Sequence, residues 1–282
     1  MIGLEKGWAK RVTLMVLRIV ALVYLGLCIV IYFKQRKLMY LPEKTLFDTP
    51  KGVGLDYSEI RLTTLDGVQL FGWHVKAETS DRKGVVLFFH GNAGNIGDRL
   101  PTAELYAGLG YDLVMVSYRG YGPSGGDPSE SGLYEDALSF WRHLTVTEGI
   151  PAHEILIHGR SLGGGPAGWL ASRVQARGLI LDSTFTSMVK EAQKVYPYLP
   201  VRWICKDRYD TESRIGSVGE PVLIIHSPED EMIPVDMAHT LFERAQEPKT
   251  LYLSEGTHND CRDVLPGYRE ALIGFLDSCA HQ

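Results

Sequence analysis

Only four cysteines occur in the 282 residues, too few and too scattered for a disulfide framework. Cys28 lies within a long apolar run. Cys205, Cys261 and Cys279 lack the spacing typical of zinc ligands. We therefore expect neither a fold held together by disulfides nor a metal site.

Basic residues are also scarce over most of the chain. Residues 1–40 hold 7 of the 29 Lys and Arg but only 1 of the 34 Asp and Glu, so the remainder carries a net charge of −11. An acidic surface binds polyanions poorly, which argues against a nucleic-acid partner. No Gly-Lys-Ser/Thr follows the glycines around residues 159–165, which disfavours a phosphate-binding loop, and we find no internal repeat or low-complexity stretch.

One long hydrophobic run is present, over residues 12–33, where 14 of 22 residues are Leu, Ile, Val or Phe. Their insertion into a bilayer is favourable by about 4–8 kcal/mol, against a cost of at most about 3 kcal/mol for Arg18. A cleaved signal peptide would have a shorter apolar core and a small-residue cleavage site. The run therefore predicts one transmembrane helix over 12–33, after an N-terminal tail over 1–11. Basic residues flank both ends, so we do not predict the side of the membrane.

After a juxtamembrane linker over 34–56, residues 57–282 have the pattern of a single α/β domain. Helix-length segments such as 134–147 and 234–245 separate short apolar runs, which predicts βαβ units and helices on both faces of a sheet. An Asp-Gly turn joins the first two runs as a hairpin. The eight predicted strands cover residues 57–64, 68–77, 84–89, 112–117, 154–158, 178–182, 221–226 and 249–253.

A Gly-Arg-Ser-Leu-Gly sequence at 159–163 lies between the predicted strand 154–158 and a helix that begins near residue 164. A serine on such a tight turn projects its hydroxyl above the sheet, and the flanking glycines relieve crowding between strand and helix. We therefore interpret Ser161 as an acyl-transfer nucleophile.

Two later loops supply a base and an acid. His258 follows the last predicted strand, and Asp230 follows the strand over 221–226. A parallel sheet brings the carboxyl ends of its strands to one edge. His258 is expected to accept the serine proton, and Asp230 to orient and stabilise the imidazole. Asp182 is a second possible acid.

The apolar run over 84–89 leads into a turn of small residues, His-Gly-Asn-Ala-Gly-Asn. This layout predicts an oxyanion hole that pairs the backbone N–H of Asn92, or of Ala93, with that of Leu162. We interpret His90 as a brace for this turn rather than as a second base.

The connection over 183–220 is longer than a crossover helix requires and is rich in aromatic residues. It predicts a small lid. We expect Tyr196, Leu199 and Trp203 to form a wall that binds substrate, although packing of these side chains onto the core explains the pattern as well.

Five separated motifs together resemble the membrane-anchored α/β-hydrolase domain proteins, including their serine aminopeptidase-like and acyl-protein thioesterase-like branch. The motifs are Gln-Arg-Lys-Leu-Met-Tyr-Leu-Pro at 35–42, His-Gly-Asn-Ala-Gly-Asn at 90–95, Tyr-Arg-Gly-Tyr-Gly-Pro-Ser-Gly at 118–125, Gly-Arg-Ser-Leu-Gly at 159–163 and Gly-Thr-His-Asn-Asp at 256–260. The resemblance covers about residues 35–280. It implies an α/β-hydrolase fold, whose sheet of eight strands is mostly parallel.

The resemblance further implies serine hydrolase activity, with Ser161, Asp230 and His258 as the catalytic triad. Members of the family act on acyl esters or thioesters, and some remove palmitate from proteins. One departure is Ser227, where many relatives have glycine before the acid loop.

The leading hypothesis is therefore a membrane-tethered, single-pass serine hydrolase that cleaves esters or thioesters of apolar acids and needs no cofactor. Its expected partners are the lipid bilayer and an acyl substrate that can itself be membrane-borne. A peptidase that holds an ammonium group with Glu229, Asp230 and Glu231 is one alternative, and a non-catalytic membrane scaffold is another. We predict neither the acyl chain length, the leaving group nor the oligomeric state.

Overall fold

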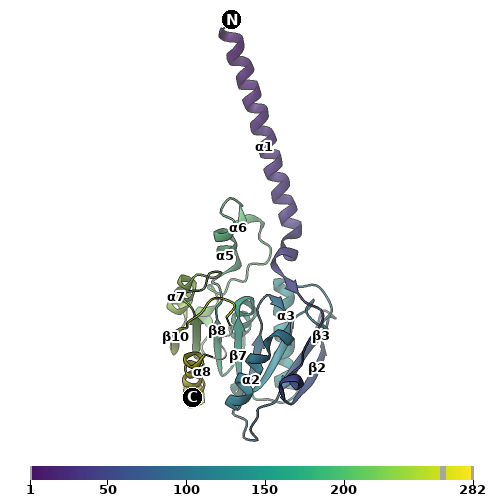
Figure 1. The fold of residues 1–282 in the computed structure, drawn as a ribbon, viewed down its shortest axis with the longest axis vertical. Helices are drawn as coiled ribbons and strands as arrows, with labels where there is room; N and C mark the ends of the chain where they lie inside the picture. The colour runs from purple at the N-terminus through teal and green to yellow at the C-terminus, as the bar shows by residue number, and fades with distance from the viewer. Residues whose placement is uncertain (1, 261–264, 281–282) are drawn as a thin grey trace.

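The structure is a computed structural model, which describes residues 2–260 and 265–280. A long helix, α1 (Ile2–Met39), projects from an α/β domain (Figure 1). At a rise of about 1.5 Å per residue it is about 57 Å long. Most of its large apolar side chains are exposed. Residues Gly7–Met39 are long and apolar enough to cross a membrane, as judged by length and composition.

The α/β domain is built on a twisted sheet of eight strands in the order β10-β9-β8-β7-β4-β6-β3-β2. β3 is antiparallel to both of its neighbours, and the other pairs are parallel. The eight strands lie where the sequence predicts them, within a few residues at each end. They are β2 (Tyr57–Thr63), β3 (Gln69–Val75), β4 (Val85–Phe89), β6 (Asp112–Ser117), β7 (Ile155–Arg160), β8 (Gly178–Asp182), β9 (Val222–His226) and β10 (Lys249–Leu253).

Helices cover both faces of this sheet, as expected for strands that are apolar on both sides. In β4, Val85, Leu87 and Phe89 pack into one core cluster, and Val86 and Phe88 pack into the other. The first cluster includes side chains of α3 (Glu130–Arg142), α4 (Gly164–Ala171) and α7 (Val235–Arg244). The second includes side chains of α2 (Leu100–Leu109) and α8 (Pro266–Ala280). The helix predicted over 134–147 begins earlier, and its last five residues form a π-helical turn over His143–Thr147.

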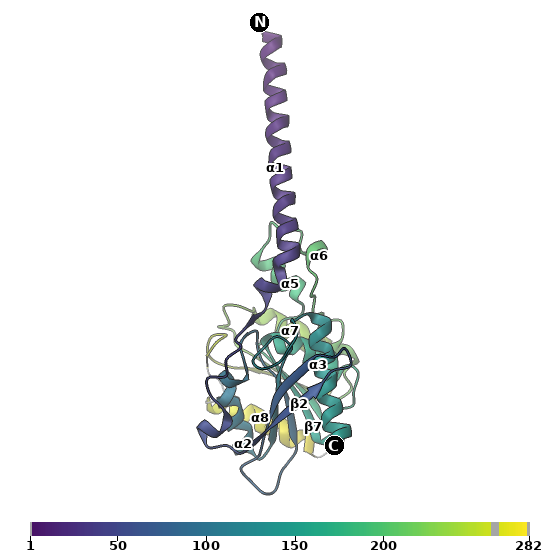
Figure 2. The same cartoon turned by 90° about the vertical axis from the view of Figure 1, so that its right-hand side faces the viewer.

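The segment over 183–220, which we call the cap, joins β8 to β9. It contains α5 (Met188–Val195) and α6 (Val201–Ile204), and both helices lie beside the domain end of α1 (Figures 1 and 2). The hydroxyl of Tyr24 in α1 donates to the Tyr198 carbonyl at 2.7 Å. The side chain of Arg36 forms a bidentate pair with Asp207, with N···O distances of 2.8 and 3.0 Å. The cap is therefore packed against the long helix.

The segment over 34–56, expected as a linker, is ordered along the domain. α1 continues to Met39, and Tyr40 is buried with its hydroxyl 2.7 Å from that of Tyr209. Next, β1 (Leu41–Pro42) pairs in parallel with β5 (Ala93–Gly94). Short 3-10 helices complete the fold at Pro50–Val53, Ile96–Arg99, Ala152–Glu154, Ser161–Gly163 and Ile215–Ser217.

Candidate active site

Ser161 occupies a strained turn between β7 and α4. Its φ angle is +52°, in the left-handed region that non-glycine residues seldom adopt. A Cβ at Gly159 would lie 2.5 Å from the Ala167 methyl, and one at Gly163 would lie 2.6 Å from the Phe89 carbonyl carbon. Strand and helix therefore approach so closely that both flanking positions require glycine. Strain of this kind gathers at functional sites because surrounding packing must maintain it.

His258 and Asp230 lie in line with the Ser161 hydroxyl. His258 Nε2 is 3.1 Å from Ser161 Oγ, and His258 Nδ1 is 2.7 Å from Asp230 Oδ2. With Nδ1 donating to the carboxylate, Nε2 carries the lone pair and can accept the serine proton. The three side chains come from loops that follow β7, β9 and β10, at the carboxyl edge of the sheet.

The backbone around Asp230 holds it as a carboxylate. Its Oδ1 accepts hydrogen bonds from the N–H groups of Met232 at 3.0 Å and Ile233 at 2.7 Å. Burial acts to raise the pKa of Asp230, but the hydrogen bonds from His258 and Ile233 outweigh it and keep the pKa below its ordinary value. Glu231 accepts the backbone N–H of His258 at 3.1 Å and so fixes the loop that carries the imidazole.

Asp182, the second candidate acid, has other partners. Its Oδ1 accepts from the Ser183 hydroxyl at 2.8 Å, and its Oδ2 accepts from the Tyr268 hydroxyl at 3.1 Å. The guanidinium of Arg160 lies 3.9 Å away. Asp182 therefore links the end of β8 to Ser183 and to Tyr268 of α8, whereas the imidazole of His258 faces Asp230.

The turn after β4 approaches Ser161 from the other side. Gly91 and Asn92 line the same cavity as the Ser161 hydroxyl, and Leu162 follows Ser161 directly at the start of the helical segment. His90 is fully buried, and its Nδ1 lies 2.7 Å from the Gly91 carbonyl. Burial is the main cause that lowers the pKa of His90 to about 3. A neutral, buried imidazole of this kind supports the turn and does not reach the cavity.

The segment after α1 also contacts the turn over residues 90–95, a contact that the sequence alone does not predict. The Leu41 N–H donates to Asn92 Oδ1 at 3.2 Å, and the Glu43 N–H donates to the Gly94 carbonyl at 3.1 Å. In the other direction, the side-chain amide of Asn95 donates hydrogen bonds to the carbonyls of Thr45 at 2.7 Å and Glu43 at 3.2 Å. Residues 41–45 thus form a clamp over the turn at residues 90–95, where the sequence predicts the oxyanion hole. The motif at 35–42, one of the five that carry the family resemblance, is the sequence signal for this contact.

The cavity at Ser161 has a volume of about 300 Å³. Leu41, Pro101 and Met232 provide apolar walls. Two basic residues that sequence reasoning missed, Arg99 and Arg160, also line it. Their guanidiniums bond to loop carbonyls, for example Arg160 Nη2 to Asp260 O at 3.1 Å.

The three lid residues expected to bind substrate do not line this cavity. Tyr196 and Trp203 are exposed, and Leu199 is half-buried. They belong to the part of the cap that lies beside α1 (Figure 2). Within residues 2–260 and 265–280, no group of three or more His, Cys, Asp or Glu side chains is arranged to hold a metal ion.

These features define the class: an α/β hydrolase that has an apolar N-terminal helix. The family profile described as "alpha/beta hydrolase fold" matches residues 84–211. Rv2307c of Mycobacterium tuberculosis is 35% identical over 267 residues, covering 94% of this chain and 95% of that protein. The membrane protein YNL320W of Saccharomyces cerevisiae is 32% identical over 258 residues, covering 87% and 90%. The chain belongs to the α/β-hydrolase fold family.

A solved structure has the same fold. The esterase Pf2001 of Pyrococcus furiosus superposes with a TM-score of 0.71 and covers 85% of this chain and 97% of its own. The two sequences are 21% identical. At that distance the likeness concerns the arrangement of the sheet and helices.

Proposed function

We propose that the protein is a membrane-tethered serine hydrolase that cleaves carboxylic esters or thioesters of apolar acyl groups through an acyl-enzyme on Ser161. The observation that carries this proposal is the alignment of Ser161 Oγ, the His258 imidazole and the Asp230 carboxylate, at separations of 3.1 and 2.7 Å. Such an array activates a hydroxyl that is otherwise a weak nucleophile at neutral pH.

The reaction has two halves. His258 Nε2 takes the Ser161 proton as Oγ attacks the acyl carbon, and the tetrahedral oxyanion accepts hydrogen bonds donated by the backbone N–H groups of Asn92 and Leu162. The imidazolium, stabilised by Asp230, returns the proton to the departing alcohol or thiol. A water molecule then loses a proton to His258 and attacks the acyl-enzyme, which frees the acid and regenerates the Ser161 hydroxyl.

The surroundings of the nucleophile favour an acyl substrate over a peptide N-terminus. A bound ammonium group needs acidic side chains at the cavity, and Glu229, Asp230 and Glu231 were the candidates. Asp230 and Glu231 are instead both engaged in holding His258. The apolar walls supplied by Leu41, Pro101 and Met232 suit an acyl chain.

We further propose that residues 12–33 cross a bilayer once and that residues 1–11 form a tail on the far side. The support is the length and apolar character of α1, whose large hydrophobic side chains are exposed rather than packed into the domain. The yeast relative, named a membrane protein, agrees with this assignment.

Labelling with a fluorophosphonate tests the catalytic proposal. The full chain in detergent micelles should become covalently labelled, and Ser161→Ala should not. Ser172→Ala is the matched control, because that hydroxyl lies at the end of α4 and donates to the Trp169 carbonyl. It should label like the unaltered chain. Equal labelling of Ser161→Ala and the unaltered chain would refute the assignment. If only the unaltered chain is labelled, its hydrolysis rates on acyl nitrophenyl esters and thioesters rank the substrates.

A further inference from the structure

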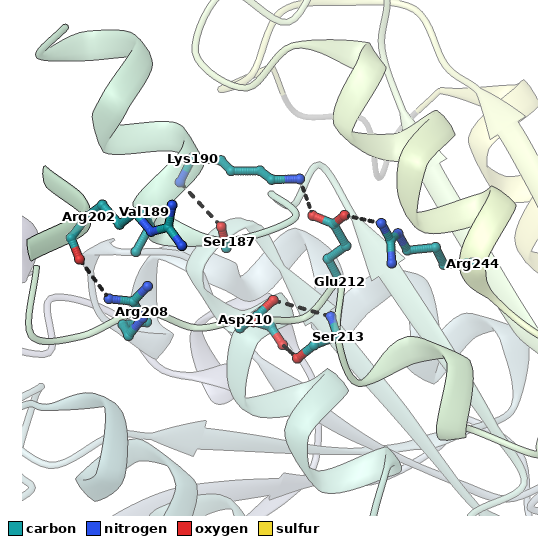
Figure 3. Close-up of a pocket in the computed structure, with 9 residues that line it drawn as sticks. All are labelled: Ser187, Val189, Lys190, Arg202, Arg208, Asp210, Glu212, Ser213 and Arg244. Carbon is teal, nitrogen blue, oxygen red and sulfur yellow. Dashed lines mark hydrogen bonds and ion pairs between the residues drawn. The ribbon is translucent and has the colours of Figure 1, made fainter.

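A second cavity, of about 380 Å³, lies within the cap and is separate from the one at Ser161. Its walls come from α5, α6, the loop after α6 and the end of α7, and Figure 3 shows basic side chains on several sides of it. The two cavities share no lining residue. The catalytic proposal gives this second cavity no role.

The charge of the cavity is positive. Four basic and two acidic side chains line it: Lys190, Arg202, Arg208, Arg244, Asp210 and Glu212. Glu212 is paired with Lys190 on one side and with Arg244, at 2.7 Å, on the other (Figure 3). Asp210 accepts a backbone hydrogen bond from Ser213 at 3.2 Å. These six side chains therefore carry a net charge of +2.

Two of the basic side chains, Arg202 and Arg208, lie on the side formed by α6 and its following loop. Arg208 Nη1 donates to the Arg202 carbonyl at 3.2 Å, and within residues 2–260 and 265–280 neither guanidinium forms an ion pair. Planar guanidiniums bind the oxygens of a phosphate in a two-pronged way, so two of them beside a cavity of this size suit a phosphate ester.

The contacts of the cap with α1 set the height of this cavity. The Gln35 side chain donates to the Ile204 carbonyl at 2.9 Å and accepts the Lys206 N–H at 2.8 Å. Residues 204–206, which lie between Arg202 and Arg208 in the chain, are therefore beside Gln35, only about 3 Å along the helix beyond the apolar run that ends at Phe33. That is the depth at which lipid headgroups meet the hydrocarbon layer.

The outer part of the cap reaches further. Tyr198 bonds to Tyr24, which lies about 14 Å along the helix on the apolar side of Phe33. The Tyr198 and Trp203 side chains are 88% and 84% exposed. Trp203 precedes Ile204, whose carbonyl contacts Gln35, so its exposed ring lies at the height where aromatic side chains settle at a membrane interface, whereas Tyr198 reaches into the hydrocarbon layer.

We propose that the cap cavity binds the phosphate of an anionic lipid headgroup in the leaflet that the aromatic tip of the cap enters. The assignment rests on the proposed membrane span, because α1 determines the height. A soluble phosphate ester carries the same chemical group, but the position of Arg202 and Arg208 next to the headgroup layer favours the lipid.

Binding of short-chain probes to the full chain tests this proposal. The protein carries Ser161→Ala so that no probe is hydrolysed, and it is held in maltoside micelles. Calorimetric titration compares dioctanoyl phosphatidic acid, dioctanoylglycerol and inorganic phosphate. We expect phosphatidic acid to bind, and Arg202→Gln or Arg208→Gln to weaken that binding about ten- to hundredfold, the usual effect of losing a charge-assisted hydrogen bond.

Lys194→Gln is the matched control, since it removes one exposed positive charge from the same cap but outside the cavity. It should leave the affinity within about twofold, the expectation for a screened surface charge. An equal loss for Lys194→Gln, or no loss for either arginine variant, overturns the site. Inorganic phosphate that binds as tightly as phosphatidic acid overturns the lipid as its source. Unchanged unfolding midpoints show that the variants remain folded.

The outcome is distinguishable from failure of the proposed function. A chain that binds phosphatidic acid but does not label with a fluorophosphonate when Ser161 is present retains the lipid site and loses the hydrolase assignment. A chain that alkaline carbonate releases from vesicles lacks the membrane span, and the lipid site falls with it.

Discussion

Replacing Asp230 by asparagine tests how the carboxylate orients the His258 imidazole while leaving the rest of the site unchanged. The two side chains have nearly the same shape, so Oδ1 can keep its bonds from the Met232 and Ile233 N–H groups. The new amide nitrogen then faces His258 Nδ1 at the place of the 2.7 Å bond. Two donors cannot pair, so the imidazole must adopt the tautomer with its proton on Nε2.

That tautomer cannot accept the Ser161 proton. In serine hydrolases with this arrangement the same substitution lowers kcat about 10⁴-fold. A 10⁴-fold loss corresponds to about 5.4 kcal/mol of transition-state stabilisation. We expect KM for a nitrophenyl ester to change little, because Asp230 does not line the cavity.

Asp182→Asn provides the matched comparison, because this carboxylate ends the neighbouring strand β8 and is also buried. Its partners are the hydroxyls of Ser183 and Tyr268, which can rotate to donate or accept. We expect kcat to stay within about tenfold even if the unfolding midpoint falls.

The assay is the initial rate of ester hydrolysis by the full chain in micelles, normalised to the folded fraction. A 10³-fold loss in Asp182→Asn together with nearly full activity in Asp230→Asn would reverse the assignment of the acid.

Three further outcomes follow from the same geometry. Gly163→Ala should destabilise the fold by about 1–3 kcal/mol and abolish fluorophosphonate labelling, because the added methyl group overlaps the end of β4. Denaturant unfolding measures the first effect and labelling the second. A normally labelled variant would contradict the geometry of the turn at Ser161. Asn95→Ala should lower kcat at least about tenfold with little change in KM, since two carbonyls of the clamp lose their donor. A rise in KM of about tenfold with unchanged kcat would instead assign the clamp to substrate binding. The free energy of unfolding should fall on acidification from pH 6 to pH 4. Burial lowers the pKa of His90 to about 3 and that of His158 to about 4, so in this range both imidazoles take up a proton in the unfolded chain but not in the folded one. Burial raises the pKa of Asp136 to about 6, so the folded chain binds one proton that the unfolded chain does not, and this offsets one of the two histidine protons. The free energy of unfolding should therefore fall by about 1.4 kcal/mol per pH unit. An unfolding midpoint in denaturant that rises on acidification contradicts this balance.

The sheet could be predicted closely from the sequence because each central strand is a short apolar run bounded by turn residues. β4, β8 and β9 are buried along their whole length, so composition alone marks them. The meeting of Ser161, Asp230 and His258 follows from chain order, since a parallel sheet collects the loops after its strands at one edge.

The cap was less predictable. Aromatic residues in a long connection indicate burial against something, but composition does not say what they face. The bond between Tyr24 and Tyr198 joins positions 174 residues apart, so the orientation of Tyr196 and Trp203 depends on a helix outside the domain. The lining of the Ser161 cavity by Arg99 was missed for a similar reason, because it comes from a turn before α2 with no catalytic motif.

The clamp over residues 41–45 changes what the N-terminal helix does for the enzyme that we propose. A loose linker would let the domain lie roughly 25 Å from its anchor on average, the span of about 20 flexible residues. Here α1 continues to within two residues of β1, and Leu41 both bonds to Asn92 and lines the cavity. The bidentate pair of Arg36 with Asp207 and the Tyr40–Tyr209 hydroxyl bond fix the same joint from the cap side. Motion of α1 relative to the domain must therefore disturb the turn over residues 90–95, so the anchor and the catalytic residues that we propose are mechanically coupled through this joint.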